Sequence, residues 1–76
     1  MNKLTSVFAK VLNIDESKIT PELSQDNTPS WDSMNAIVLM TEIEKAYGIK
    51  FGYNEAMSIK TFGDVEKLLE AKGVTL

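Results

Sequence analysis

The sequence predicts an all-α protein, a small four-helix bundle with three longer helices, one short third helix and a long first loop. Three segments carry apolar residues at helical spacing, and a turn-rich stretch with two prolines separates the first two of them. With 76 residues, 43% of them apolar, the chain has the size and composition of one small globular domain. We therefore expect a single domain over residues 1–76.

The first helix is expected over roughly residues 2–13. Asn2 can cap its start, and Asn13 suits a left-handed residue at its end. Such a stripe is more typical of core than of a binding surface. The apolar residues that recur one turn apart are Leu4, Val7, Phe8, Val11 and Leu12.

Residues 14–30 are expected to form a long loop, because their two prolines forbid one continuous helix. Loops longer than about 12 to 15 residues are usually functional or disordered. This loop has spaced apolar anchors, which favour a functional loop fixed to the core. The anchors are Ile14, Ile19 and Leu23.

The second helix is expected to begin after Asp32, a favourable N-cap whose carboxylate can accept from free N–H groups of the first turn. Ser33 then occupies the first helical position, where its hydroxyl should be exposed beside unpaired backbone donors that suit a phosphate. Trp31 precedes the cap. It either packs onto the first turn as a hydrophobic staple or contacts a partner, and the sequence leaves both open.

The second helix has one core-facing side and one side expected to face water. The outward side is unusual because two of its four residues are apolar, and Ile37 lies at its border. The core-facing residues are Ala36, Leu39, Met40, Ile43, Ala46 and Tyr47. The outward residues are Met34, Val38, Thr41 and Lys45.

Two further helices are expected after Gly48, which ends the second. Asn54 could cap a helix of about one turn. Thr61 is a good N-cap for the last helix, with Asp64 completing a capping box. The last helix has an apolar stripe and a closing Lys-Gly pair: Phe62, Val65, Leu68, Leu69, Lys72 and Gly73.

Composition excludes several functions. The chain has no cysteine or histidine, and so no thiol nucleophile, no thiolate metal site and no histidine base. Glu42 and Glu44 lie two residues apart on a helix and diverge, so an enzyme is not expected. Eight lysines, no arginine and a net charge of -3 argue against nucleic-acid binding. Without an apolar run long enough for a transmembrane segment or signal peptide, we expect a cytoplasmic monomer.

The triplet Asp32-Ser33-Met34 opening a helix resembles the acyl carrier proteins and the related peptidyl carrier domains. The similarity continues through Leu39, Ile43, Glu44 and the stretch 47–51, Tyr-Gly-Ile-Lys-Phe, and it covers essentially the whole chain. The resemblance implies that Ser33 carries a 4′-phosphopantetheine arm. A phosphopantetheinyl transferase would attach this arm from coenzyme A, supplying the metal and the base.

The resemblance further implies a stand-alone carrier that bears acyl or aminoacyl groups as thioesters on the arm. Its expected partners are the transferase, an acyl- or aminoacyl-loading ligase, and an acyltransferase or synthase. The residues expected to contact partners are Asp32, Met34, Ile37 and Val38. In the family the short third helix helps to shelter the acyl chain. Met57 and Ile59 would form that wall, although each alone is more simply explained as core.

The sequence departs from the fatty-acid carriers, which present a row of acids along the second helix. Here Asn35, Val38 and Thr41 occupy much of that face. This favours a carrier in a specialised pathway, such as polyketide, nonribosomal peptide or envelope biosynthesis, over general fatty acid biosynthesis. The alternative is a helical adaptor that is never loaded. An adaptor would tolerate Ser33→Ala but not Val38→Lys, whereas a carrier would be sensitive to both.

Overall fold

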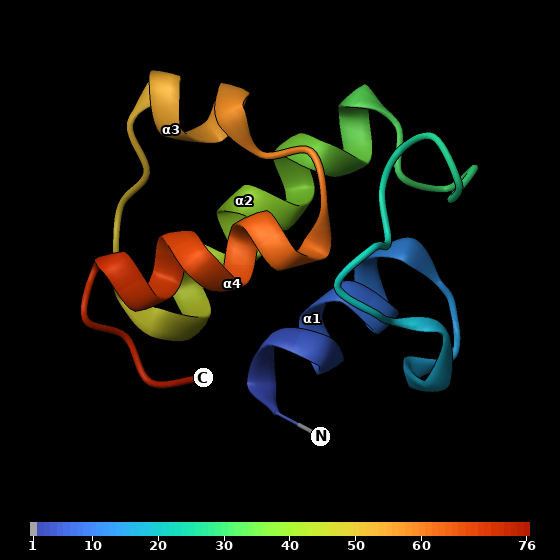
Figure 1. Cartoon of the computed structure of the whole chain (residues 1–76), viewed down its shortest axis with the longest axis horizontal. Helices are drawn as coiled ribbons and strands as arrows, with labels where there is room; N and C mark the ends of the chain where they lie inside the picture. Colours follow the sequence, from blue (N-terminus) through green and yellow to red (C-terminus); the bar gives the residue numbers. More distant parts are fainter. Residues whose placement is uncertain (1) are drawn as a thin grey trace.

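The computed structural model describes residues 2–76, which form four α-helices and one short 3-10 helix (Figure 1). The first, second and fourth α-helices are long and the third is short, so the predicted all-α fold is confirmed. The elements are α1 (Lys3–Leu12), η1 (Glu16–Lys18), α2 (Ser33–Tyr47), α3 (Tyr53–Ser58) and α4 (Phe62–Ala71).

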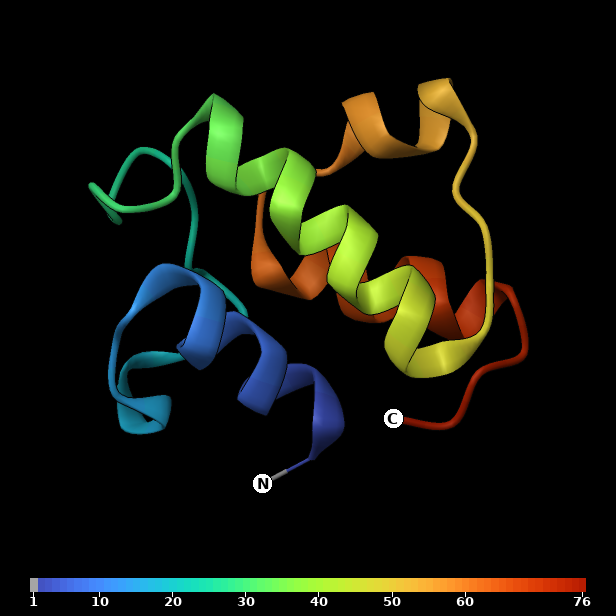
Figure 2. The same cartoon turned by 180° about the vertical axis from the view of Figure 1, so that it is seen from behind.

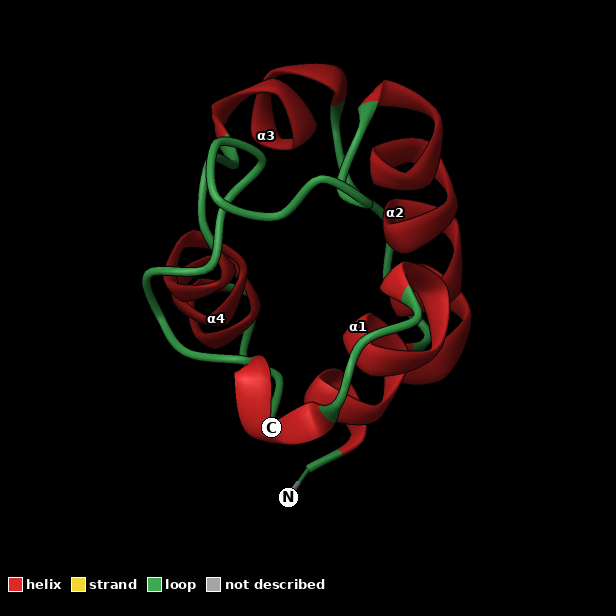
Figure 3. Ribbon diagram, turned by 90° about the vertical axis from the view of Figure 1, so that its right-hand side faces the viewer, coloured by secondary structure: helices red, strands yellow, loops and turns green. Residues whose placement is uncertain are grey.

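The helices are arranged around α2, the longest of them. Figure 2 shows α2 running diagonally through the molecule, with α4 behind it and α1 below. α1 packs directly against α2. α3 lies at the end of the molecule where α2 begins, and the chain termini lie at the other end (Figures 1 and 3). This arrangement brings the short helix close to the first turns of α2.

The core is centred on Phe8, a fully buried ring of α1. The rings of Trp31 and Phe62 meet it edge to face, with centroid distances of 5.3 and 4.8 Å. Such pairs contribute about 0.5–1.5 kcal/mol each beyond the burial of their surface. The cluster joins α1, the end of the long loop and α4. The other buried apolar residues are Leu4, Leu12, Leu23, Leu39, Ile43, Val65 and Leu69.

Most helix ends follow the predicted signals. Asn2 caps α1, and Asn13 ends it in the left-handed conformation with φ of 56°. Gly48 ends α2 with φ of 66°. The Thr61 hydroxyl accepts from the Asp64 N–H at 3.1 Å, and the Asp64 carboxylate accepts in return from the Thr61 N–H at 3.2 Å.

The expected cap of the short helix was wrong. α3 begins at Tyr53, so Asn54 lies inside it and Gly52 is its N-cap. The Gly52 N–H donates to Glu55 Oε1 at 2.8 Å. Because this carboxylate, three positions into the helix, reaches back to the cap, α3 starts without a capping side chain.

The long loop is fixed to the start of α4. The Phe62 N–H donates to the Leu23 carbonyl at 2.8 Å, and the Gly63 N–H donates to the Pro21 carbonyl at 3.0 Å. A Cβ at position 63 would lie 3.1 Å from that carbonyl, a tight contact that glycine avoids. An isolated bridge joins Ser24 to Thr61. These contacts and η1 were not predicted, and they fix the path of the chain towards Ser33.

Candidate functional site

Ser33 is the first residue of α2 and is exposed. Asp32 caps the helix, with its Oδ1 accepting from the Asn35 N–H at 2.8 Å. Asn35 Nδ2 donates in turn to the Ser30 carbonyl at 2.6 Å. No hydrogen bond among residues 2–76 involves Ser33 Oγ, so this hydroxyl is free on a fixed turn. The positive end of the α2 dipole beside it favours a phosphate there.

Trp31 anchors the backbone just before the helix. Its side chain is 4% exposed and packs against Phe8, and its backbone N–H donates to the Thr28 carbonyl at 2.9 Å. Of the two interpretations of this residue, the structure favours packing over an exposed contact with a partner. The buried ring holds the chain two residues before Ser33, so the hydroxyl is displayed from a rigid base.

A groove of about 400 Å³ opens beside Ser33, between α2 and α3. Met57 lines it from α3 and is 63% exposed, whereas Ile59 also lines it and packs partly against the core. None of its lining residues is ionisable. The remaining lining residues are Gln25, Trp31, Ser33, Ala36, Ile37, Met40 and Ala56. A group attached to Ser33 therefore has an adjoining apolar surface.

The outward apolar residues of α2 are exposed, with Met34 at 74%, Ile37 at 69% and Val38 at 40%. They lie on one side of α2, because residues three and four positions apart on a helix are neighbours, but they border different grooves. Ile37 lines the groove beside Ser33, whereas Val38 lines a second groove against α1. Successive residues are about 100° apart around a helix, so Ile37 and Val38 lie at the two edges of this side, with Met34 between them. Contact with partners by Asp32, Met34, Ile37 and Val38 stays a prediction.

The acids of α2 are not arranged as a row. Glu44 Oε2 accepts from the Phe51 N–H at 2.8 Å, which orders the chain after the helix. Glu42 lies on the side of α2 that faces α1. Thr41 is exposed and uncharged, with its hydroxyl donating to the Ile37 carbonyl at 3.0 Å. The face after Ser33 is therefore mainly apolar and neutral.

α3 is held by a charged contact rather than by burial. Lys72 Nζ lies 3.0 Å from Glu55 Oε1 and 5.9 Å from the centroid of the Phe51 ring. The hydrogen bond from the Gly52 N–H, followed by the interaction with Lys72, lowers the pKa of Glu55. No residue of α3 is buried. α3, which forms one wall of the groove beside Ser33, is therefore only weakly attached to the bundle.

The described residues contain no helix that is both long and apolar enough to cross a membrane. Within the same range, residues 2–76, no three acidic side chains gather as metal ligands.

Two comparisons with known proteins agree with this geometry. A family model described as "phosphopantetheine attachment site" matches residues 2–69. The solution structure of a holo acyl carrier protein from Geobacter metallireducens is similar, with a TM-score of 0.82 and 33% identity over 91% of this chain and 79% of that one. A candidate acyl carrier protein from Mycobacterium tuberculosis has a TM-score of 0.81 and 26% identity over 91% and 92% of the two chains.

The match to the family model spans nearly the whole chain. Members of this family are carriers on which enzymes act, rather than enzymes, and they bear covalently attached 4′-phosphopantetheine. The exposed hydroxyl at a helix start and the adjoining apolar groove suit such a group. The chain therefore belongs to the family of phosphopantetheine-bearing carrier proteins.

Proposed function

We propose that Ser33 is the attachment residue and that the protein carries acyl groups as a stand-alone carrier in a specialised pathway. The observation that carries this proposal is the exposed Ser33 hydroxyl at the start of α2, beside a groove without ionisable residues. When bound, the prosthetic group supplies a thiol that holds an acyl group as a thioester.

Attachment requires only that Ser33 be reachable. Its oxygen forms a bond to the phosphorus of coenzyme A that adjoins the pantetheine, and the bond from that phosphorus to the adenosine bisphosphate breaks. The hydroxyl proton passes to a base of the transferase. The chain itself has no histidine for this step. Its contribution is the turn held by Asp32 and Asn35, which keeps the hydroxyl exposed at the positive end of the α2 dipole.

The lining of the groove favours an uncharged acyl group over an aminoacyl group. A free ammonium placed among Ile37, Met40 and Met57 would lose water without gaining a counter-charge. An apolar chain would instead gain contact with these side chains. The same reasoning applies to partners, since the exposed Met34 and Ile37 near Ser33 favour apolar rather than strongly electrostatic docking.

The test begins with the apo protein, coenzyme A and a promiscuous phosphopantetheinyl transferase. Intact mass spectrometry should show one arm added to the wild type and to Ser17→Ala, which removes another exposed hydroxyl. Ser33→Ala should show no addition while keeping its helical circular dichroism. If the wild type stays unmodified while the same transferase modifies a control carrier, the proposed attachment to Ser33 is wrong. The chain would then be an adaptor.

A second measurement tests the cargo. The transferase can be given hexanoyl- or alanyl-coenzyme A, and methyl NMR spectra of the two products compared. The hexanoyl product should shift the Met57 and Ile59 methyl signals more strongly than the alanyl product. Equal shifts, or larger shifts with the alanyl product, would contradict the preference for uncharged acyl groups without affecting the attachment.

A further inference from the structure

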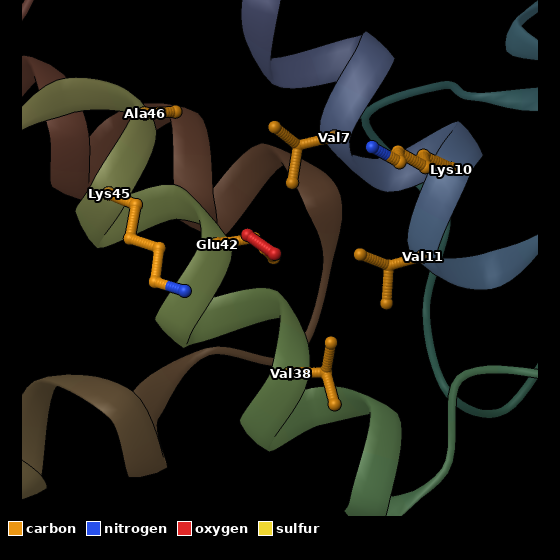
Figure 4. A pocket seen from close by; sticks show the side chains of 7 residues that line it. All are labelled: Val7, Lys10, Val11, Val38, Glu42, Lys45 and Ala46. Atoms are coloured by element: carbon orange, nitrogen blue, oxygen red, sulfur yellow. The ribbon is translucent and has the colours of Figure 1, made fainter.

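A second groove lies on the other side of α2, between this helix and α1 (Figure 4). Its volume is about 480 Å³. The apolar part comes from Val7 and Val11 on α1 and from Val38 on α2. Val7 and Val11 are half-buried, whereas Val38 is exposed. The three valines therefore leave apolar surface open to solvent at the junction of the two helices.

Three charged side chains also line this groove. Lys10 extends from α1 and Lys45 from α2, while the Glu42 carboxylate points into the groove between the helices (Figure 4). Both lysines are exposed, and neither forms an ion pair with a carboxylate of residues 2–76. The groove thus has a local excess of positive charge on a chain whose net charge is -3.

We propose that this groove, formed by Val7, Lys10, Val11, Val38, Glu42 and Lys45, docks an acidic amphipathic segment of a partner protein. Apolar side chains of the segment pack on the three valines, and its carboxylates pair with the two ammonium groups. The charge of the whole chain does not prevent this, because at physiological salt interactions are screened beyond about 8 Å.

The position of the groove leaves Ser33 accessible. Val38 and Lys45 are on the side of α2 opposite to Ser33 and Met40. At 1.5 Å per residue, they lie about 8 and 18 Å from Ser33 along the helix axis. A partner held by α1 and α2 therefore covers neither the Ser33 hydroxyl nor the groove beside it. Docking here does not require the prosthetic group, so this proposal is independent of the proposed function.

The test uses two synthetic amphipathic helical peptides that share a leucine face. One has glutamates flanking that face, and the other has lysines in their place. In amide NMR titrations of the full chain, the acidic peptide should bind saturably and shift the signals of Val7, Val11 and Val38. Lys10→Glu combined with Lys45→Glu should weaken this binding at least tenfold. Glu42→Gln should strengthen it.

A matched control changes the net charge equally at a distance. Lys18→Glu combined with Lys60→Glu alters two exposed lysines outside the groove and should weaken binding much less. Ser33→Ala should bind the peptide normally, and the Lys10/Lys45 variant should still be modified on Ser33. These two results separate docking in this groove from the proposed carrier function.

Three results would overturn the proposal. One is that the acidic and basic peptides bind equally well, or that the acidic peptide binds the two charge-reversed variants equally well. Another is a set of shifts centred on Ile37 and Met57 instead of the valines. The third is concentration-dependent dimerisation of the free protein that blocks the peptide, which would identify a second copy of the chain as the occupant.

Discussion

The two grooves beside α2 differ in charge and in how firmly their outer walls are held. The groove beside Ser33 has no ionisable lining residue, whereas the other carries two lysines and a glutamate. α1 forms the wall of the charged groove and buries three large side chains in the core. α3 forms the wall of the uncharged groove and buries none.

On the two proposals above, this difference separates two functions along one helix. A wall anchored by Leu4, Phe8 and Leu12 has a fixed shape, which suits recognition of one kind of surface. A wall that buries no residue and is held by a cap and an ion pair is less constrained, and under the proposed function it would adjust to attached groups of different size. α2 is shared by both grooves, and its buried residues Leu39 and Ile43 face neither of them.

The largest effect is expected from shortening a buried side chain of α1, with an exposed side chain of α3 as its comparison. Phe8→Ala should destabilise the protein by about 3–5 kcal/mol, because it leaves a cavity between Trp31 and Phe62. That is a large part of the roughly 4–11 kcal/mol expected for a domain of this size. Met57→Ala should cost less than about 0.5 kcal/mol. Urea denaturation measures both, and similar losses would refute the contrast between the walls.

A smaller effect is expected at the start of α2, which borders only the groove beside Ser33. Asp32→Ala should lose about 1 kcal/mol of stability, because the Asn35 N–H loses its acceptor. Asp32→Asn keeps a capping oxygen and should be nearly as stable as the wild type. If the asparagine variant is stable but is modified more slowly by the transferase, the charge of Asp32 contacts the enzyme. Equal rates would limit Asp32 to capping.

The smallest effect is expected from releasing α3. Lys72→Met removes the ion pair to Glu55 and should accelerate hydrogen exchange in α3 while leaving exchange in α1 unchanged. Lys18→Met removes an exposed lysine that forms no ion pair within the described chain, and should leave both helices unchanged. Faster exchange in α1 would show that the two walls are not independent.

Acid should produce the same local change. The pKa of Glu55 is lower in the folded protein than in the unfolded chain, so the unfolded form binds more protons. The stabilisation of α3 is therefore complete above the ordinary glutamate pKa of about 4.3 and is lost as the pH falls through the folded value. NMR shifts of α3 between pH 6 and 3 should show this transition in the wild type and not in Glu55→Gln. The same transition in both proteins would exclude Glu55 as its cause.

Local signals in the sequence predicted the helix ends well, because capping is decided within a few residues. Asn13, Gly48 and Thr61 each have the conformation or hydrogen bond expected of them. The exception is α3, where the Glu55 carboxylate replaces a capping side chain and so starts the helix before Asn54. Contacts between distant segments, such as that between Ser24 and Thr61, left no local signal and were not predicted.

The order of residues was enough to predict the four α-helices, the exposed position of Ser33 and the unusual apolar residues on the outward face of α2. These features depend on spacing and on neighbours within one turn. Packing of distant segments was needed to show that Ile37 and Val38 line different grooves, that Trp31 is buried, and that one groove carries charge. A helix fixes the direction of each side chain, but the positions of α1 and α3 decide what each side chain meets.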